Sequence, residues 1–81
     1  MRHTKSINIS MVKMDRHPLN GKTLRLIKYL ESGGMVPPIK VASLKQGGYI
    51  IKDGRHRITA FKLLDRPEIK AKYSTKPILI K

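Results

Sequence analysis

The chain has 81 residues, which is enough for one small domain with a single hydrophobic core and too few for a second. Eighteen Lys and Arg against five Asp and Glu give a formal net charge of +13 at pH 7, far beyond what solubility requires. The absence of cysteine excludes disulfides and thiolate metal sites, and no apolar run approaches the roughly 20 residues of a membrane span, so we expect a single cytoplasmic domain over residues 1–81 without a membrane partner.

The first third of the chain predicts a strand, a loop and a helix. Apolar residues alternate with polar ones from Ile7 to Val12, which is typical of a strand with one buried face. Residues 15–20 then form a loop in which Asn20 is a suitable helix cap. The helix is expected over residues 21–32, where Leu24, Ile27 and Leu30 form an apolar stripe before two glycines end it.

The remaining elements alternate strands with one further helix. Two prolines, at 37 and 38, keep the chain extended as it enters a strand near residues 39–42. A glycine-rich turn at 46–48 leads to a strand at 49–51, and a second helix follows over 55–65. A strand is expected at 69–73 and a last short one at 78–80.

This order of elements predicts an α+β fold in which a small mixed sheet packs against two main helices. The predicted core residues are the inward-facing members of these elements. They are Ile7, Ile9, Leu24, Ile27, Leu30, Ile39, Val41, Ile51, Ile58, Phe61, Leu64 and Ile69. Tyr49 and Phe61 are expected to pack with this core and not to form a base-stacking platform, because their neighbours share their apolar periodicity.

The junction between the 49–51 strand and the second helix carries the most chemistry. Asp53 and Gly54 form a turn, and Arg55, His56 and Arg57 follow in the first helical turn. Cations are unfavourable there, since the free N–H groups already make a helix start positive. A bound phosphate would relieve that repulsion, so these residues predict a phosphate site; the alternative is a solvated basic helix start.

Two acid-base groups accompany this junction. Asp53 and His56 are three residues apart, so a helix start could place them beside one bound group as metal ligand and general acid or base. Asp53 could equally cap the helix, as aspartate commonly does at that position. A zinc site is not expected, because the three histidines lie in separate segments without metal-ligand spacing.

These residues carry a resemblance to a known family. The stretch from Gly54 to Ala60 resembles the G-x-x-R-x-x-A phosphate motif of the ParB/sulfiredoxin superfamily, and the stretch from Gly34 to Val41 resembles the Gly-Pro segment of ParB N-terminal domains. The resemblance implies a ParB/sulfiredoxin-like fold and a phosphate or nucleotide ligand, CTP or ATP with Mg²⁺. The residues it assigns to that ligand are Gly54, Arg55, His56, Arg57 and the loop residue Arg16.

The chain also departs from the family pattern. Arg55 stands where ParB proteins usually have the glutamate implicated in nucleotide hydrolysis, and Pro37 stands where they have a glutamine near the base. Sulfiredoxins place a cysteine at the position of Arg55, so the sulfiredoxin reaction is excluded here. A shorter resemblance to free serine kinases implies that Asp53 could be a metal or hydroxyl partner.

The charge of the chain favours a nucleic-acid partner over a membrane, because the basic residues are spread over all elements, and we expect that partner to be DNA. We expect the single domain to bind it alone or as a homo-oligomer. The alternative is that the charge only keeps the protein soluble. The residues assigned to nucleic acid are Lys22, Arg25, Lys28 and Lys52, of which the first three form a row on the first helix that is either solvated or phosphate-tracking.

Three functions fit these features. The first is a nucleic-acid-binding accessory protein, of a kind suited to a plasmid, phage or other mobile element. The second is a metal-dependent nuclease, nucleotide phosphohydrolase or kinase that uses Asp53 and His56, and the third is a nucleotide-binding switch. Binding is preferred, because Asp53 and Glu31 are the only acids expected near the site and Mg²⁺ chemistry generally uses several carboxylates.

Overall fold

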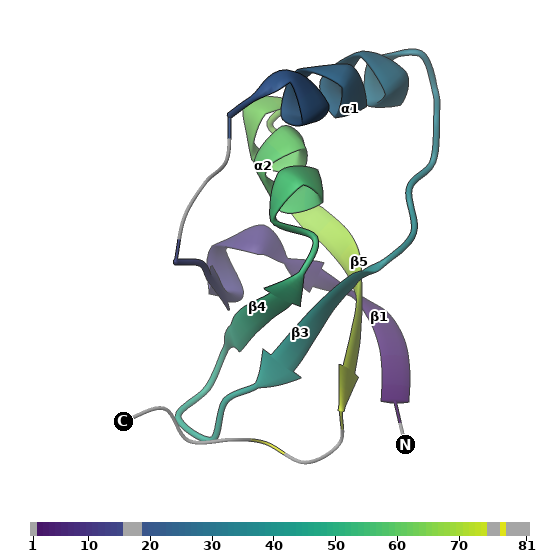
Figure 1. The fold of residues 1–81 in the computed structure, drawn as a ribbon. Helices are drawn as coiled ribbons and strands as arrows, with labels where there is room; N and C mark the ends of the chain where they lie inside the picture. The colour runs from purple at the N-terminus through teal and green to yellow at the C-terminus, as the bar shows by residue number, and fades with distance from the viewer. Residues whose placement is uncertain (1, 16–18, 75–76, 78–81) are drawn as a thin grey trace.

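The structure is a computed structural model that describes residues 2–15, 19–74 and 77. Within these residues the chain forms a five-stranded sheet, two α-helices and one 3₁₀ turn (Figure 1). The elements in chain order are β1 (Arg2–Asn8), η1 (Ile9–Met11), β2 (Val12–Lys13), α1 (Gly21–Glu31), β3 (Ile39–Ser43), β4 (Tyr49–Asp53), α2 (Arg55–Leu63) and β5 (Glu68–Ser74). The predicted strand at 78–80 lies outside the described residues.

The strands form one mixed sheet in the order β1-β5-β3-β4-β2. β3 lies at the centre, antiparallel to β4 and parallel to β5, while β1 pairs antiparallel with β5 and β2 pairs parallel with β4. Both helices lie together at one end of the sheet (Figure 1) and pack against each other. The α+β class with a mixed sheet and two helices is confirmed. No helix in the described part of the chain has the length and hydropathy needed to cross a membrane.

The first strand ends earlier than the alternating pattern predicted. Asn8 closes β1, and its side-chain Oδ1 accepts hydrogen bonds from the Ser10 backbone N at 2.9 Å and the Ser10 Oγ at 2.7 Å. A side chain that binds the following backbone in this way competes with the strand ladder, so residues 9–11 form a 3₁₀ turn. Ile9 is nevertheless buried as predicted, whereas Met11 is half exposed.

Helix α1 begins where the sequence predicted and turns a different face to the core. The Asn20 Oδ1 accepts from the backbone N of Lys22 at 3.1 Å and of Thr23 at 3.3 Å, which confirms Asn20 as the cap. The prediction for Leu24 is wrong, because its side chain is 55% exposed while Thr23 is completely buried. Thr23 and Leu30 lie seven residues apart on one helical face, and a polar residue on that face hid the correct phase from the apolar pattern.

The core fills the space between the sheet and α2. Ile39 of β3 and Ile58 of α2 are completely buried at its centre. Phe61 packs against this cluster from the side and is half-buried, as are Ile27 and Leu64. The other members of the cluster are Ile7, Ile9, Val12, Val41, Ile51, Ile69 and Ala71. Apart from Leu24, the predicted core residues are therefore buried or half-buried.

The core face of the sheet also carries a cluster of aromatic rings, which lies beyond the part that packs against the helices. Tyr49 and Tyr73 pack edge to face with ring centroids 6.2 Å apart, and the Lys5 Nζ lies 5.1 Å from the Tyr73 centroid. A hydrogen bond with the Tyr49 hydroxyl is the main cause of a raised pKa at Lys5, and electrostatic attraction to Tyr49 and Tyr73 adds to it. Tyr49 packs against the core as predicted.

Candidate phosphate-binding site

A single glycine joins the central sheet to the start of α2. β4 ends at Asp53 and α2 begins at Arg55, so Gly54 alone makes the turn, with φ 108° and ψ 26° in the left-handed region. A Cβ on Gly54 would lie 2.5 Å from the Cγ2 of Ile39, which is closer than any side chain tolerates. Glycine is required here both by the backbone angle and by the close approach to β3.

The expectation that Asp53 caps α2 is wrong. Gly54 occupies the cap position, and no side chain makes a capping hydrogen bond there. Asp53 stays within β4, where a register shift places it opposite Lys40 of β3. Its carboxylate is therefore held at the strand end instead of turning back to the helix N–H groups.

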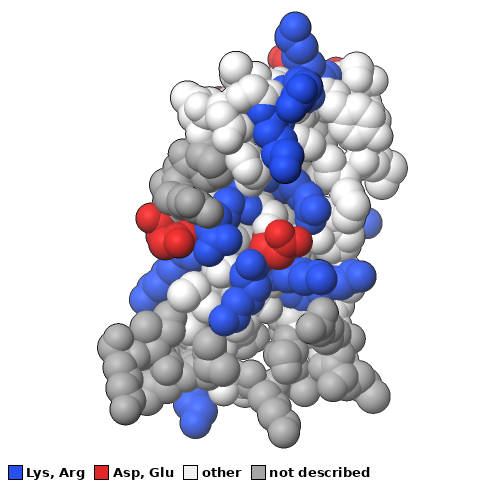
Figure 2. Space-filling view, in the orientation of Figure 1, with Lys and Arg blue, Asp and Glu red and all other residues white. Residues whose placement is uncertain are grey.

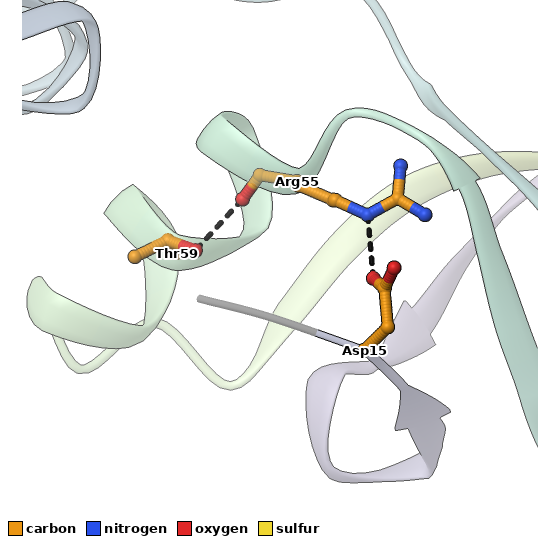
Figure 3. Close-up of polar contacts among 3 residues, drawn as sticks. All are labelled: Asp15, Arg55 and Thr59. Carbon is orange, nitrogen blue, oxygen red and sulfur yellow. Dashed lines mark hydrogen bonds and ion pairs between the residues drawn. The ribbon is translucent and has the colours of Figure 1, made fainter. Parts of the chain in front are cut away.

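The helix start presents free donors. The backbone N of Ile58 donates to the Gly54 carbonyl at 3.0 Å and makes the first bond of the helix. The N–H groups of Arg55, His56 and Arg57 precede it, so helix geometry leaves them without intrahelical acceptors. The Thr59 Oγ1 donates to the Arg55 carbonyl at 2.7 Å and fastens this first turn (Figure 3). Such an end carries a partial positive charge and favours anions.

These donors border a cleft of about 650 Å³ between the starts of α1 and α2. The lining residues are Asn20, Lys22, Leu26, Asp53, Gly54, Arg55, His56 and Arg57. The cleft gathers every predicted phosphate-binding residue of the Gly54–Arg57 turn, together with both predicted acid-base residues. Lys22 is the one member of the predicted nucleic-acid row among its described lining residues.

Arg57 is fixed by the segment that precedes β3. Its Nη1 donates to the Pro38 carbonyl at 3.1 Å, and its side chain is half-buried. This bond uses one of the five N–H donors of the guanidinium, which leaves the others for a ligand. The two stretches that resemble the family motif, around Gly34 to Val41 and around Gly54 to Ala60, therefore meet at this arginine.

Arg55 has an acidic partner that the sequence did not suggest. Its Nε donates to the Asp15 Oδ1 at 2.7 Å (Figure 3), with the Arg55 side chain 27% and the Asp15 side chain 64% exposed. An exposed pair of this kind contributes little to stability, at most about 1 kcal/mol. Its consequence is local, because Asp15 offsets part of the positive charge at the helix start.

His56 is oriented by a buried hydroxyl. The Oγ1 of Thr23 and the Nδ1 of His56 lie 3.1 Å apart, and Thr23 has no exposed surface. The contact links the first turns of the two helices beside the cleft, which His56 lines. Because one ring nitrogen is engaged by Thr23, the Nε2 is the atom with which His56 can meet a ligand.

The family assignment follows from a comparison of the whole sequence. The family model of the ParB N-terminal domain matches residues 2–77. The chain belongs to the ParB N-terminal domain family. A comparison with curated protein sequences gives no match.

Solved structures share the fold of this ParB-family domain. Sulfiredoxin from Arabidopsis thaliana superposes with a TM-score of 0.79 at 22% identity, over 93% of this chain and 88% of that one. The C-terminally truncated chromosome-partitioning protein ParB from Caulobacter crescentus, complexed with CTP-gamma-S, gives 0.73 at 16% identity, over 89% of this chain and 44% of that one. A free serine kinase in complex with AMP gives 0.79 at 18% identity, over 89% of this chain and 31% of that one. This chain thus spans less than half the length of the last two proteins, and the ParB/sulfiredoxin superfamily fold is established.

The ParB-like cleft has one acidic lining residue among those described, Asp53. Its side chain is exposed and makes no hydrogen bond or ion pair with any residue that the structure describes. No group of three or more His, Asp or Glu residues in the described ranges is arranged to hold a metal ion. The cleft therefore offers a metal ion one protein carboxylate, and further ligands would have to come from a bound phosphate.

The remaining predicted residues of the ParB-like domain lie apart from the cleft. Arg25 and Lys28 are exposed on α1, and Lys52 is exposed on β4, but none of the three lines the cleft. Arg16 lies outside the described residues. Figure 2 shows Lys and Arg side chains running from the helices to the middle of this face, with acidic side chains among them.

Sequence reasoning missed three contributors to the site. Asp15, Thr23 and Pro38 each contact a motif residue from 19 to 40 positions away along the chain. The sequence carries one signal for Thr23, since it begins a helix whose buried face continues to Leu30.

Proposed function

We propose that this ParB-like domain is a nucleic-acid-binding protein whose cleft at the start of α2 holds the phosphates of a nucleotide such as CTP or ATP. The observation that carries the proposal is the convergence of free helix N–H groups and Arg57 on one cleft, with the helix start fixed by Gly54. Helix N–H groups form a ready-made anion site, and the charge-assisted, bidentate bonds of a guanidinium to a phosphate are among the strong hydrogen bonds in proteins.

The size of the cleft suits a nucleotide better than a bare phosphate. Its volume of about 650 Å³ lies inside the range of small-molecule sites, about 300–1,000 Å³. Leu26 supplies an apolar patch in a cleft whose other described lining residues are mainly polar. A base or ribose can lie against that patch while the phosphates meet Arg57 and the helix start.

The relatives support a nucleotide as the ligand. The ParB structure from Caulobacter crescentus holds CTP-gamma-S, and the free serine kinase structure holds AMP. Where Mg²⁺ accompanies the nucleotide, Asp53, the acidic residue among the described lining residues, would help to hold it, and the ion would offset the charge of the phosphates. The nucleic-acid part of the proposal is supported by the net charge of +13 and by membership of the ParB N-terminal domain family.

Calorimetric titration of CTP and ATP, with and without Mg²⁺, tests the nucleotide part. Arg57→Ala should weaken binding at least about tenfold, since a hydrogen bond to a charged group contributes about 1.5–3 kcal/mol. Arg25→Ala removes the same charge from an exposed position on α1 outside the cleft and should change the affinity less than about twofold. Equal nucleotide affinities for the parent protein and Arg57→Ala would show that neither this arginine nor the cleft takes part in nucleotide binding.

A second function, metal-dependent nuclease, nucleotide phosphohydrolase or kinase, is favoured by one observation. Asp53 and His56 line the same cleft, and Asp53 makes no contact with another described residue that would occupy its carboxylate. The enzyme would use Asp53 to hold Mg²⁺ or Mn²⁺ and His56 to move a proton. Asp53→Asn should then abolish metal-dependent turnover and leave nucleotide binding in place, whereas a binding protein shows no Asp53-dependent turnover at all.

A further inference from the structure

The sheet has a second face, opposite the core, that is rich in lysine. Along β3 and β5 the buried residues Ile39, Ile69 and Ala71 alternate with the exposed residues Lys40, Lys70 and Lys72. Because side chains alternate across a strand, these lysines point away from the core and the helices. Two further exposed lysines come from the neighbouring strands, Lys13 of β2 and Lys52 of β4.

The strand register brings these cations close together. Lys40 of β3 lies directly opposite Lys72 of β5 in the parallel ladder, and the residue beyond Lys72, on β1, is Thr4. Lys70 follows on the same strand at i–2 from Lys72, about 6–7 Å away. Like charges placed directly opposite each other destabilise a sheet, so the strands carry a repulsion that a bound anion would remove.

Few acids offset this charge. Asp53 lies opposite Lys40 at the register shift on β4, and Glu68 begins β5 at its far end. No ion pair joins either acid to a lysine within the described residues. The repulsion among Lys40, Lys70 and Lys72 is therefore reduced only by solvent or by an external anionic partner, as far as the described residues show.

We propose that this lysine face, formed by Lys13, Lys40, Lys52, Lys70 and Lys72, is the surface along which the backbone of double-stranded nucleic acid lies. The proposal rests on the nucleic-acid part of the proposed function and names the surface that carries it. It differs from the row of Lys22, Arg25 and Lys28, which lies on α1 and not on the strands.

The chemistry of the face favours nucleic acid over a membrane. Its apolar members, Ala42 and Ile50, are half-buried, and no large exposed hydrophobic residue stands beside the lysines on β3, β4 or β5 to enter a bilayer. A lysine ammonium is a point charge on a flexible stem and lacks the planar fork of arginine, so we expect contacts from this face to go mainly to phosphates, which carry little sequence information.

The face and the cleft are chemically distinct. The cleft holds its arginines in place through Pro38 and Asp15 and suits one compact ligand. The lysine face is built from five strand positions without fixed partners among the described residues and suits an extended polymer. Nucleic-acid binding and nucleotide binding are therefore expected to respond to different substitutions.

The test compares two triple variants that remove the same charge. Lys40→Gln/Lys70→Gln/Lys72→Gln neutralises the centre of the lysine face, and Lys22→Gln/Arg25→Gln/Lys28→Gln neutralises the α1 row. Affinity for two duplex DNAs of equal length and unrelated sequence is measured by fluorescence anisotropy over a range of salt. Removing three phosphate contacts from the lysine face should weaken binding at least about tenfold on both sequences and lower the slope of log K against log[salt] by up to about 2.7. The α1 variant should lose less than about threefold, from overall charge alone.

A second measurement uses the unaltered protein, so its result does not depend on whether the triple variants fold. Lysine acetylation, read by mass spectrometry with and without duplex, should show protection of Lys40, Lys70 and Lys72 and much less of Lys22 and Lys28. Equal losses in the two triple variants, or protection confined to α1, would overturn the lysine face while the nucleic-acid function stands. Failure of the parent protein to bind either duplex, or equal binding of anionic phospholipid vesicles in place of DNA, would overturn the nucleic-acid function itself and the lysine face with it.

Discussion

The hydroxyl of Thr23 and the Nδ1 of His56 lie 3.1 Å apart and join the first turns of the two helices. Thr23 is completely buried, whereas His56 is half-buried. This contact provides the Thr23 hydroxyl with a polar partner in the interface between the helices. It also orients the imidazole of His56, which lines the cleft. The contact therefore links the packing of α1 to the orientation of a cleft residue at the start of α2.

Thr23→Val should both destabilise the protein and loosen the site. Valine keeps the shape and removes the hydroxyl, which leaves the imidazole without its partner and costs about 1–3 kcal/mol of unfolding free energy. Urea unfolding measures this term, and nucleotide titration should show weaker binding. Thr4→Val, at an exposed position on β1, should stay within about 0.5 kcal/mol of the parent protein. Unchanged stability and unchanged nucleotide affinity in Thr23→Val would show that the contact between Thr23 and His56 contributes to neither.

Gly54→Ala should destabilise the protein more than the same change at Gly47. Both glycines have positive φ, 108° and 99°, so alanine meets the same backbone cost of about 1–2 kcal/mol at each. At Gly47 nothing lies within 4 Å of the new Cβ, whereas at Gly54 it would overlap Ile39. The overlap should add about 1–3 kcal/mol, measured as the difference between the two variants in urea unfolding. Equal losses would show that α2 can move away from β3 without penalty.

Asp15→Asn should strengthen anion binding with little change in stability. The substitution replaces the carboxylate that accepts from Arg55 by a neutral amide, so the charge of this arginine is no longer offset and is available to a ligand. The exposed pair contributes at most about 1 kcal/mol, so the unfolding midpoint should barely move while nucleotide affinity rises by up to about fivefold. Asp65→Asn makes the same charge change outside the cleft, at a positive φ that asparagine also adopts. The same rise in both variants would mean that only the net charge matters.

The sequence predicted the order of most elements because their signals are local. Asn20 at the start of α1 and the glycine before α2 act within a few residues, and the structure has both helices where these residues indicated. The alternation across β3 and β5 likewise needs no long-range information. The fold class and the superfamily could therefore be predicted from the chain alone.

The errors arose where distant residues decide the outcome. Leu24 is exposed because the buried face of α1 is set by Thr23, whose hydroxyl is satisfied by a histidine 33 residues away. Asp53 is not the cap because β4 continues through it and pairs with β3. The Arg55 partner Asp15 lies 40 residues away, and nothing in the local sequence of either residue points to the other.

The most direct test of the account follows the backbone amides of α2 during a nucleotide titration by NMR. The amide signals of Arg55, His56 and Arg57 should shift in a saturable way on addition of CTP or ATP with Mg²⁺, because these N–H groups have no intrahelical acceptor and belong to residues that line the cleft. The amide of Lys62, in the last turn of the same helix, should stay in place and serves as the internal reference. Saturable shifts confined to residues 55–57 and the other cleft residues are the predicted result. Shifts that avoid the helix start, or the absence of any saturable shift, would contradict a phosphate site there.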